Sequence, residues 1–272
     1  MLSPLLSNIV LNNLDWWIAN QWEYVKTKHN YTAISKLRAI KKTNLKQMYI
    51  VRYADDFKIF TNSHKSAIKI YHATKGYLKN QLNLDMSPEK SAITNLRKRT
   101  SDFLGFSLKA VTKRNRYVAN THIMDKKMKS IQEKCKKLIL EIQNNPTPKA
   151  VMNYNAYILG IKNYYKIATH INIDLGKIAY LLSKALHNRL KSIGKYGIPI
   201  KPSGTYKRLH KNNFRTYKIA GLYLFPLADI RTSNAMNFSQ DISNYTKAGR
   251  RKRHQNIRAD IAIEINKMSH IP

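Results

Sequence analysis

The sequence predicts an α+β fold, with antiparallel strands in its first part and mainly helices from about residue 121. Between residues 49 and 60, apolar residues alternate on either side of an acidic pair, a pattern typical of a strand, a tight turn and a second strand. From about residue 124, apolar residues recur every three or four positions in three successive stretches, which indicates a small helical bundle. We therefore expect two regions, residues 1–120 and residues 121–272.

The composition points to a polyanionic partner. The chain has 272 residues and a formal net charge of +34, and the basic residues are spread along its whole length. A broad basic surface of this kind favours nucleic acid. An acidic membrane surface is the competing partner, but no run of about 18 apolar residues and no clear signal peptide is present. We therefore expect no membrane association.

The cysteine and histidine pattern argues against a structural zinc site. Cys135 is the chain's single cysteine, so it cannot form an internal disulfide, and it occupies an apolar position of a helical pattern. The nine histidines are scattered without a pair at ligand spacing. We expect Cys135 to fill the core.

The first region divides into elements of clear pattern. We expect a helix over residues 3–19, an exposed basic insertion over 23–47 with phosphate contact as a second interpretation, and a helix over 63–82 capped by Ser63. A turn at 84–91 should lead into a short strand. Residues 102–106 read as a strand in which Gly105 marks a bulge or a close backbone approach. Residues 113–116 form a basic turn that returns the chain.

The second region reads as helix, break, helix and helix. The first helix is expected from about residue 124 to 142, the second carries apolar residues between 156 and 168, and the third runs from about 174 to 192. Residues 194–217 interleave basic and aromatic side chains, which suits RNA, because cations meet phosphates and rings stack on unpaired bases. Residues 222–225 predict a buried strand.

The acidic pair in the apolar hairpin is the main chemical signal. Asp55 and Asp56 lie between the two predicted strands. Carboxylates at such a position suit two-metal phosphoryl transfer, in which Mg²⁺ ions clamp the attacking and leaving oxygens. The alternative is an ordinary turn, since aspartate tolerates bent backbone and bonds its own chain.

Several motifs together resemble reverse transcriptases encoded by group II introns. The hairpin carries Tyr53-Ala54-Asp55-Asp56, and the first helix carries Leu2-Ser3-Pro4-Leu5-Leu6-Ser7-Asn8-Ile9-Val10-Leu11-Asn12. The segment Leu159-Gly160-Ile161-Lys162-Asn163-Tyr164-Tyr165 and the segment from Asn244 to Arg250, with His254, are similar to the maturase region of that family. The resemblance runs from Leu2 to about His254.

The resemblance implies a partial palm in residues 1–120 and a thumb and maturase domain in residues 121–272. It implies RNA-templated DNA synthesis with two Mg²⁺ ions held by Asp55 and Asp56. The family uses a third aspartate and fingers, which we expect to lie upstream of this sequence, so we expect poor polymerisation by this chain alone. Beyond His254 we expect no endonuclease domain.

The resemblance and the basic clusters also predict contact residues. Near the nucleotide and the primer-template we expect Tyr53, Ala54, Lys90 and Gly105. Against RNA we expect basic and aromatic residues of the later segments, namely Arg114, Arg116, Lys162, Tyr164, Tyr165, Lys207, Arg208, Lys211, Arg215 and Arg250.

Three hypotheses about function stay open at this point. The chain is part of a mobile-element enzyme that works with a separate N-terminal half, a splicing cofactor that binds group II intron RNA without catalysis, or a degenerate remnant with an exposed sheet edge. The expected partners are intron RNA and a DNA primer or target. We expect a bacterial cytoplasmic location, with a mitochondrion or plastid as the alternative. Whether Met1 is a true start also stays open.

Overall fold

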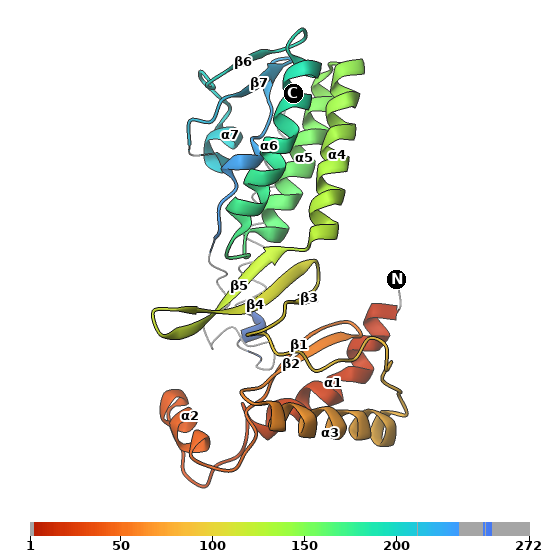
Figure 1. The fold of residues 1–272 in the computed structure, drawn as a ribbon, viewed down its shortest axis with the longest axis vertical. Coiled ribbons are helices and arrows are strands. Elements are labelled where there is room, and N and C mark those ends of the chain that lie inside the picture. Colours follow the sequence, from red (N-terminus) through yellow and green to blue (C-terminus); the bar gives the residue numbers. More distant parts are fainter. Residues whose placement is uncertain (1–2, 211, 234–246, 248, 252–272) are drawn as a thin grey trace. The chain divides into compact units, whose positions relative to one another are not determined.

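The computed structural model of Figure 1 describes residues 3–210, 212–233, 247 and 249–251. The chain forms two compact units, residues 1–95 and residues 96–272. Both units combine helices with small antiparallel sheets, which confirms the predicted α+β class. Within the described part of the chain, no helix combines the length and the apolar character needed to cross a membrane.

The first unit packs three helices with one β-hairpin. Its elements are α1 (Ser3–Gln21), α2 (Ala33–Lys41), β1 (Tyr49–Tyr53), β2 (Asp56–Phe60) and α3 (His64–Leu82). Helix α3 begins where predicted, because the Ser63 side chain accepts a hydrogen bond from the backbone N–H of Ser66. The core of the unit is formed by buried apolar side chains of α1, α2, β1 and α3 and by Trp22 directly after α1; the helix and strand residues include Leu14, Ile18, Ile40, Ile50, Ile70 and Leu78.

Two predictions for this unit are corrected. The basic insertion at 23–47 is not a loop throughout, because α2 forms within it and buries Ile40 against the core, with Leu37 packed beside it. A spacing of three residues places both side chains on one helix face. The short strand expected after the turn at 84–91 is also wrong, since none of the residues described between 83 and 100 lies in a strand.

The hairpin forms as predicted, and its buried face carries Ile50 and not Val51 or Tyr53. Val51 and Tyr53 are 48% and 66% exposed, whereas Ile50 is 8% exposed. The register pairs Ile50 with Ile59 and Arg52 with Phe57. Directly paired residues share a face of a hairpin, so Ile50 and Arg52 lie on the same face as Phe57 and Ile59.

The second unit joins two small sheets to a helical bundle. One sheet has the order β3 (Ser101–Phe103), β4 (Phe106–Lys113), β5 (Arg116–Ile123), and the other has the order β6 (Lys195–Gly197), β7 (Thr216–Ile219), β8 (Leu222–Tyr223). The helices are α4 (Asp125–Asn144), α5 (Pro148–Tyr165), α6 (Ile171–Leu190) and α7 (Gly204–Leu209), with a 3-10 turn at Leu227–Asp229. The three long helices confirm the predicted bundle.

The long helices bury a shared apolar core. Helices α4, α5 and α6 run side by side (Figure 1), and their core side chains include Ile139, Ile158, Leu175 and Ile178. Cys135 is fully buried there, as predicted, and burial raises the pKa of its thiol to about 12. The thiol is therefore protonated at neutral pH and inert to alkylation in the folded protein.

A buried aspartate joins the first sheet of this unit to the bundle. Asp174, near the start of α6, is 2% exposed. Its carboxylate accepts a hydrogen bond of 2.8 Å from the backbone N–H of Ile123 and lies 2.9 Å from His122 Nδ1. The sheet β3–β5 thus packs with the helices, and the compact units divide at residue 95. The proposed division into palm and thumb at residue 120 stays a prediction.

Three hairpins of this unit share one turn geometry. The residues between paired strands have positive φ at both central positions, at Leu104–Gly105, Arg114–Asn115 and Ala220–Gly221. Two consecutive positive φ values are the signature of the type I′ hairpin turn. The predicted basic turn at 113–116 is confirmed. The prediction that Gly105 lies within a strand is wrong, because Gly105 is the second turn residue, at φ +80°.

Gly194 and Gly176 give a matched test of packing in this unit. A Cβ at Gly194 would lie 2.6 Å from Ile219 Cγ1 and 3.1 Å from the Lys218 carbonyl oxygen, whereas a Cβ at Gly176 in α6 would meet nothing within 4 Å. We expect Gly194→Ala to lower the free energy of unfolding by about 1–3 kcal/mol through overpacking. Gly176→Ala should raise it by about 0.5–1 kcal/mol through helix propensity. Urea denaturation followed by circular dichroism measures both, and equal effects would contradict the prediction.

Candidate catalytic hairpin and nucleic-acid interface

The acidic turn connects β1 to β2 through two residues. Tyr53 pairs with Asp56, so Ala54 and Asp55 alone form the loop. Ala54 adopts φ +52°, a conformation that costs a residue with a side chain about 1 kcal/mol or more. Asp55 and Asp56 are both exposed. The turn therefore presents two adjacent carboxylates to solvent on a strained backbone.

Arg52 holds this turn against α1. Its guanidinium binds the Asp15 carboxylate through two contacts, Nε to Oδ1 at 2.9 Å and Nη2 to Oδ2 at 2.6 Å. Its remaining nitrogen, Nη1, donates to the Ala54 carbonyl oxygen at 2.7 Å and to Asn8 Oδ1 at 2.9 Å. Arg52 and Asp15 side chains are each only 10% exposed. The planar fork of arginine suits this arrangement, because it makes several contacts in fixed directions.

Sequence reasoning missed Arg52 and Asp15 as residues of the site. Asp15 interrupts the apolar stripe of the first helix, and Arg52 occupies a strand position directly before the acidic motif. A carboxylate on a core-facing stripe and a cation beside the turn could together have predicted an ion pair, because buried charges are normally paired. The sequence does not show that the two meet, since they are 37 residues apart.

The hairpin can supply two carboxylates to a metal ion. Among the residues that the structure describes, no group of three or more histidine, cysteine, aspartate or glutamate side chains is placed to hold a metal. Asp15 is engaged by Arg52, which leaves Asp55 and Asp56. Two hard oxygen ligands suit Mg²⁺, which takes the rest of its coordination from water and substrate phosphates.

The other predicted nucleotide contacts lie in different places. Tyr53 is exposed beside the carboxylates at the end of β1. Lys90 is exposed in the turn that follows α3. Gly105 lies in the second unit, in the β3–β4 turn. The structure brings Tyr53, Ala54, Asp55 and Asp56 together at one turn, and the roles predicted for all these residues stay predictions.

The Gly105 turn is held by the segment at the end of α5. A Cβ on Gly105 would lie 3.0 Å from Tyr165 Oη, so the glycine permits a close approach. Tyr164 donates a hydrogen bond of 2.8 Å to the Leu104 carbonyl oxygen, and its ring stacks on Phe106 at 5.6 Å. Sequence reasoning did not connect these two segments, which are about 60 residues apart.

Comparison with known proteins finds a family match for the region that contains the hairpin. Residues 1–108 match the reverse transcriptase (RNA-dependent DNA polymerase) family, and this region includes α1, the hairpin and its acidic turn. The predicted resemblance is confirmed. The chain is also 25% identical to the COX1/OXI3 intron 2 protein and to the COX1/OXI3 intron 1 protein of Saccharomyces cerevisiae. The two alignments cover 67% and 72% of this chain.

The two yeast proteins are intron proteins by name, which agrees with the predicted resemblance to intron-encoded proteins. The two alignments extend over more of this chain than the reverse transcriptase match at residues 1–108. They cover only 28% and 31% of the yeast proteins, so the chain spans about a third of their length. The activities of a whole intron-encoded reverse transcriptase are therefore matters for proposal.

Outside the reverse transcriptase match, the predicted RNA contacts differ in exposure. Tyr164 is 53% exposed, whereas Tyr165 is 7% exposed and packs in the core, so an RNA contact at Tyr165 would require its ring to leave the core. The Lys162 ammonium donates a hydrogen bond of 2.7 Å to the Leu209 carbonyl oxygen and joins α5 to α7. The remaining described cations are all exposed, namely Arg114, Arg116, Lys207, Arg208, Arg215 and Arg250.

Some predicted residues fall outside the described part of the chain. Lys211 is one of them, and so is most of the closing segment from Asn244 to Arg250, together with His254. The described cations lie at the β4–β5 turn, on α7, before β7 and at residue 250. This distribution leaves several separate basic positions on the second unit, and their RNA contacts stay predictions.

Proposed function

We propose that this chain is part of an intron-encoded reverse transcriptase that binds intron RNA and contributes Asp55 and Asp56 to Mg²⁺-dependent DNA synthesis. The observation that supports it most is the acidic turn, clamped by Arg52, within the region that matches reverse transcriptases. The substrates would be an RNA template, a DNA primer and deoxynucleotides, and the biological outcome would be intron mobility.

The proposed chemistry assigns distinct tasks to the residues of the hairpin. Asp55 and Asp56 would hold Mg²⁺, with Asp55 as the principal ligand. Bound Mg²⁺ would promote attack of the primer 3′-hydroxyl on the α-phosphate of the nucleotide, with loss of pyrophosphate. Arg52 orients the turn through the Ala54 carbonyl oxygen and so sets the direction of the carboxylates. Tyr53 lies beside them, where a sugar or base of the primer-template would pass.

A second candidate function is a splicing cofactor that binds intron RNA without polymerising. It is favoured by the finding that the described residues offer two carboxylates at the turn and no group of three metal-ligand side chains. A net charge of +34 supports RNA binding in either case. An intron RNA that performs its own splicing chemistry would need from this chain only binding and stabilisation.

Primer extension and RNA retention, measured on the same samples, test the proposal. The purified chain would be given Mg²⁺, deoxynucleotides and a primed RNA template, with and without the N-terminal region of a related intron-encoded reverse transcriptase added in trans. Extension under either condition supports the enzyme. RNA retention without extension under both conditions supports the splicing cofactor. If the chain neither extends the primer nor retains RNA, the proposed function is contradicted.

Charge reversal on α7 gives a specific prediction for RNA binding. Lys207 and Arg208 are exposed in its last turn. We expect the double variant Lys207→Glu/Arg208→Glu to lower RNA affinity at least about tenfold near physiological salt, because bound cations release counterions from the phosphates. The slope of log affinity against log salt concentration should fall by about two. Filter binding over a salt series measures both quantities.

A control pair distinguishes local contact from general charge. Lys41 and Lys42 are exposed near the end of α2, in the other unit. The matched variant Lys41→Glu/Lys42→Glu changes the net charge by the same amount. If both double variants weaken binding equally, the α7 cations make no special contact and the prediction fails.

A further inference from the structure

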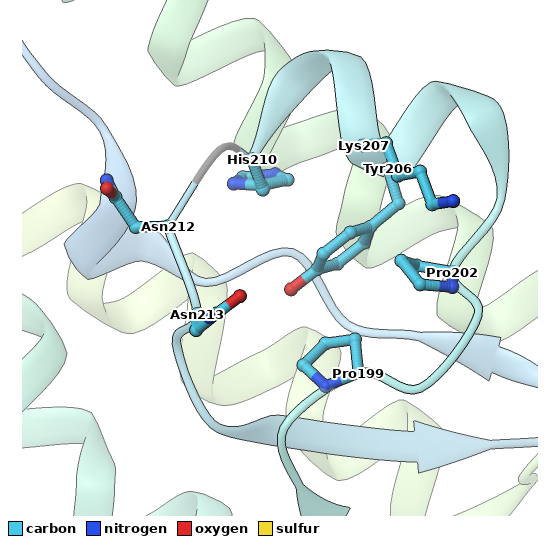
Figure 2. Close-up of a pocket in the computed structure, with 7 residues that line it drawn as sticks. All are labelled: Pro199, Pro202, Tyr206, Lys207, His210, Asn212 and Asn213. Carbon is cyan, nitrogen blue, oxygen red and sulfur yellow. The ribbon is translucent and has the colours of Figure 1, made fainter.

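A polar pocket opens beside α7 in the second unit. Its volume is about 420 Å³, within the range of small-molecule sites. Figure 2 shows the seven residues that line it, which are Pro199, Pro202, Tyr206, Lys207, His210, Asn212 and Asn213. They come from the segment before α7, from α7 itself and from the loop that leads to β7.

Hydrogen bonds to the surrounding scaffold fix the pocket walls. Tyr223 on β8 contacts both backbone groups of Ile200, at 3.1 Å each. Lys162 on α5 binds the Leu209 carbonyl oxygen at 2.7 Å. Asn155, also on α5, accepts from the Phe225 N–H at 2.8 Å and donates to the Tyr223 carbonyl oxygen at 2.9 Å. The pocket is therefore supported by α5 and β8.

Two polar atoms at this pocket have no partner among the described residues. They are Tyr206 Oη and His210 Nε2, and each exposes less than 1 Å². Tyr206 is 4% exposed as a residue, and the His210 side chain is 1% exposed. An unpaired buried polar atom costs about 1–3 kcal/mol. Such groups at a pocket call for a ligand that completes their hydrogen bonds.

The neighbours of His210 determine which hydrogen bond its free nitrogen makes. The Asp229 carboxylate lies 2.9 Å from His210 Nδ1 and also accepts from the Asn212 side-chain amide. Burial lowers the pKa of His210, so the ring is neutral at pH 7, and the Asp229 contact places its proton on Nδ1. Nε2 is then an acceptor. Burial raises the pKa of Tyr206 to about 12, so its hydroxyl keeps its proton and can donate.

The charges around the pocket discriminate between ligand classes. The acceptor nitrogen of His210, backed by the Asp229 carboxylate, repels an anion from the inner wall. The Lys207 ammonium at the rim attracts one. Pro199 and Pro202 add flat apolar surfaces. A neutral, planar, polar group attached to a phosphate matches this arrangement, with the planar group inside and the phosphate at the rim.

We propose that the pocket receives one unpaired nucleobase of a bound RNA, with its adjacent phosphate against Lys207. Each of the four bases carries a hydrogen-bond donor next to an acceptor on its pairing edge, which matches His210 Nε2 and Tyr206 Oη. Figure 2 shows the Tyr206 hydroxyl pointing toward Asn213, an exposed residue that lines the pocket. This inference rests on the proposed RNA-binding function.

Tyr206→Phe tests the inference with little risk to the fold. The variant removes one oxygen that has no partner and keeps the ring, which packs near His210 and Phe225. The measurement compares the affinity of the full chain for a single-stranded RNA oligonucleotide with its affinity for the same backbone carrying abasic residues. In the wild type we expect tighter binding of the oligonucleotide with bases. The variant should reduce that ratio about three- to tenfold, the effect of one hydrogen bond.

Controls separate this inference from the proposed function. Tyr180→Phe alters a tyrosine on α6 that is 80% exposed, and it should leave the ratio unchanged. A 4-thiouridine oligonucleotide should crosslink within residues 199–213 in the wild type, whatever the stability of the variant. Equal affinity for RNA with and without bases, or crosslinks only outside residues 199–213, overturns the proposed nucleobase site. The proposed RNA-binding function is not contradicted by either result. Absence of all RNA binding overturns the proposed function as well.

Discussion

Asp55→Ala should lower Mg²⁺-dependent primer extension on an RNA template on the order of a thousandfold, the scale of losing one essential transition-state contact. The physical reason is that the turn presents two adjacent carboxylates, and the described residues provide no further acidic cluster to replace one. Removing Asp55 leaves one charge to hold Mg²⁺, so both affinity and position of the ion suffer. Single-nucleotide extension, with and without the added N-terminal region, measures the effect.

Two controls make this prediction specific. Asp102 on β3 is an exposed aspartate in the other unit, so Asp102→Ala should leave extension unchanged. RNA retention should be the same for Asp55→Ala and the wild type, because the variant removes none of the cations that bind phosphate. Extension that survives Asp55→Ala would show that the hairpin is structural, and a parallel loss of RNA retention would show misfolding.

Arg52→Ala should lower the free energy of unfolding of the first unit by about 3 kcal/mol, the low end for breaking a buried ion pair. The variant leaves the Asp15 carboxylate only 10% exposed and without its partner. It also removes the donor to the Ala54 carbonyl oxygen, so the acidic turn loses its link to α1. Arg52→Lys keeps the charge but loses the several directed contacts of the guanidinium, so we expect a smaller decrease in the free energy of unfolding than for Arg52→Ala.

The distribution of tryptophan makes this measurement local. All three tryptophans of the chain, Trp16, Trp17 and Trp22, lie in the first unit. Urea denaturation followed by tryptophan fluorescence therefore reports that unit.

Arg38→Ala, which alters an exposed arginine on α2, should change stability by less than about 0.5 kcal/mol. The double variant Asp15→Ala/Arg52→Ala should be more stable than the sum of the single losses implies, since neither charge is left alone. A loss below about 0.5 kcal/mol in Arg52→Ala would show that the ion pair contributes little.

Much of the fold could be predicted from local sequence pattern. The helices α1, α3, α4, α5 and α6 and the acidic hairpin were all predictable, because period and capping are properties of neighbouring residues. Helix α2 was missed, since its lysine-rich sequence hides the two apolar residues that anchor it. The β6–β7–β8 sheet was largely missed as well, because its strands are two to four residues long.

The candidate site could likewise be predicted only in part. The acidic pair and the basic, aromatic segment around α7 are visible as motifs. The face that the hairpin buries was not, because both faces of β1 carry apolar residues, with Val51 on one and Ile50 on the other, and only packing in the core of the first unit selects between them. The burial of Tyr165 beside an exposed Tyr164 likewise depends on the neighbouring sheet, with Phe106 against both rings.

By itself, then, the sequence determined the α+β class, the reverse transcriptase resemblance and the two carboxylates, all of which depend on residues close together in the chain. Tertiary structure alone decided that Arg52 joins Asp15 to the acidic turn across 37 residues, and that Tyr206 lines one pocket with His210, whose ring contacts Asp229. The physical reason is that burial and hydrogen-bond partners across long separations are set by how the elements pack, and local pattern does not specify which partners meet.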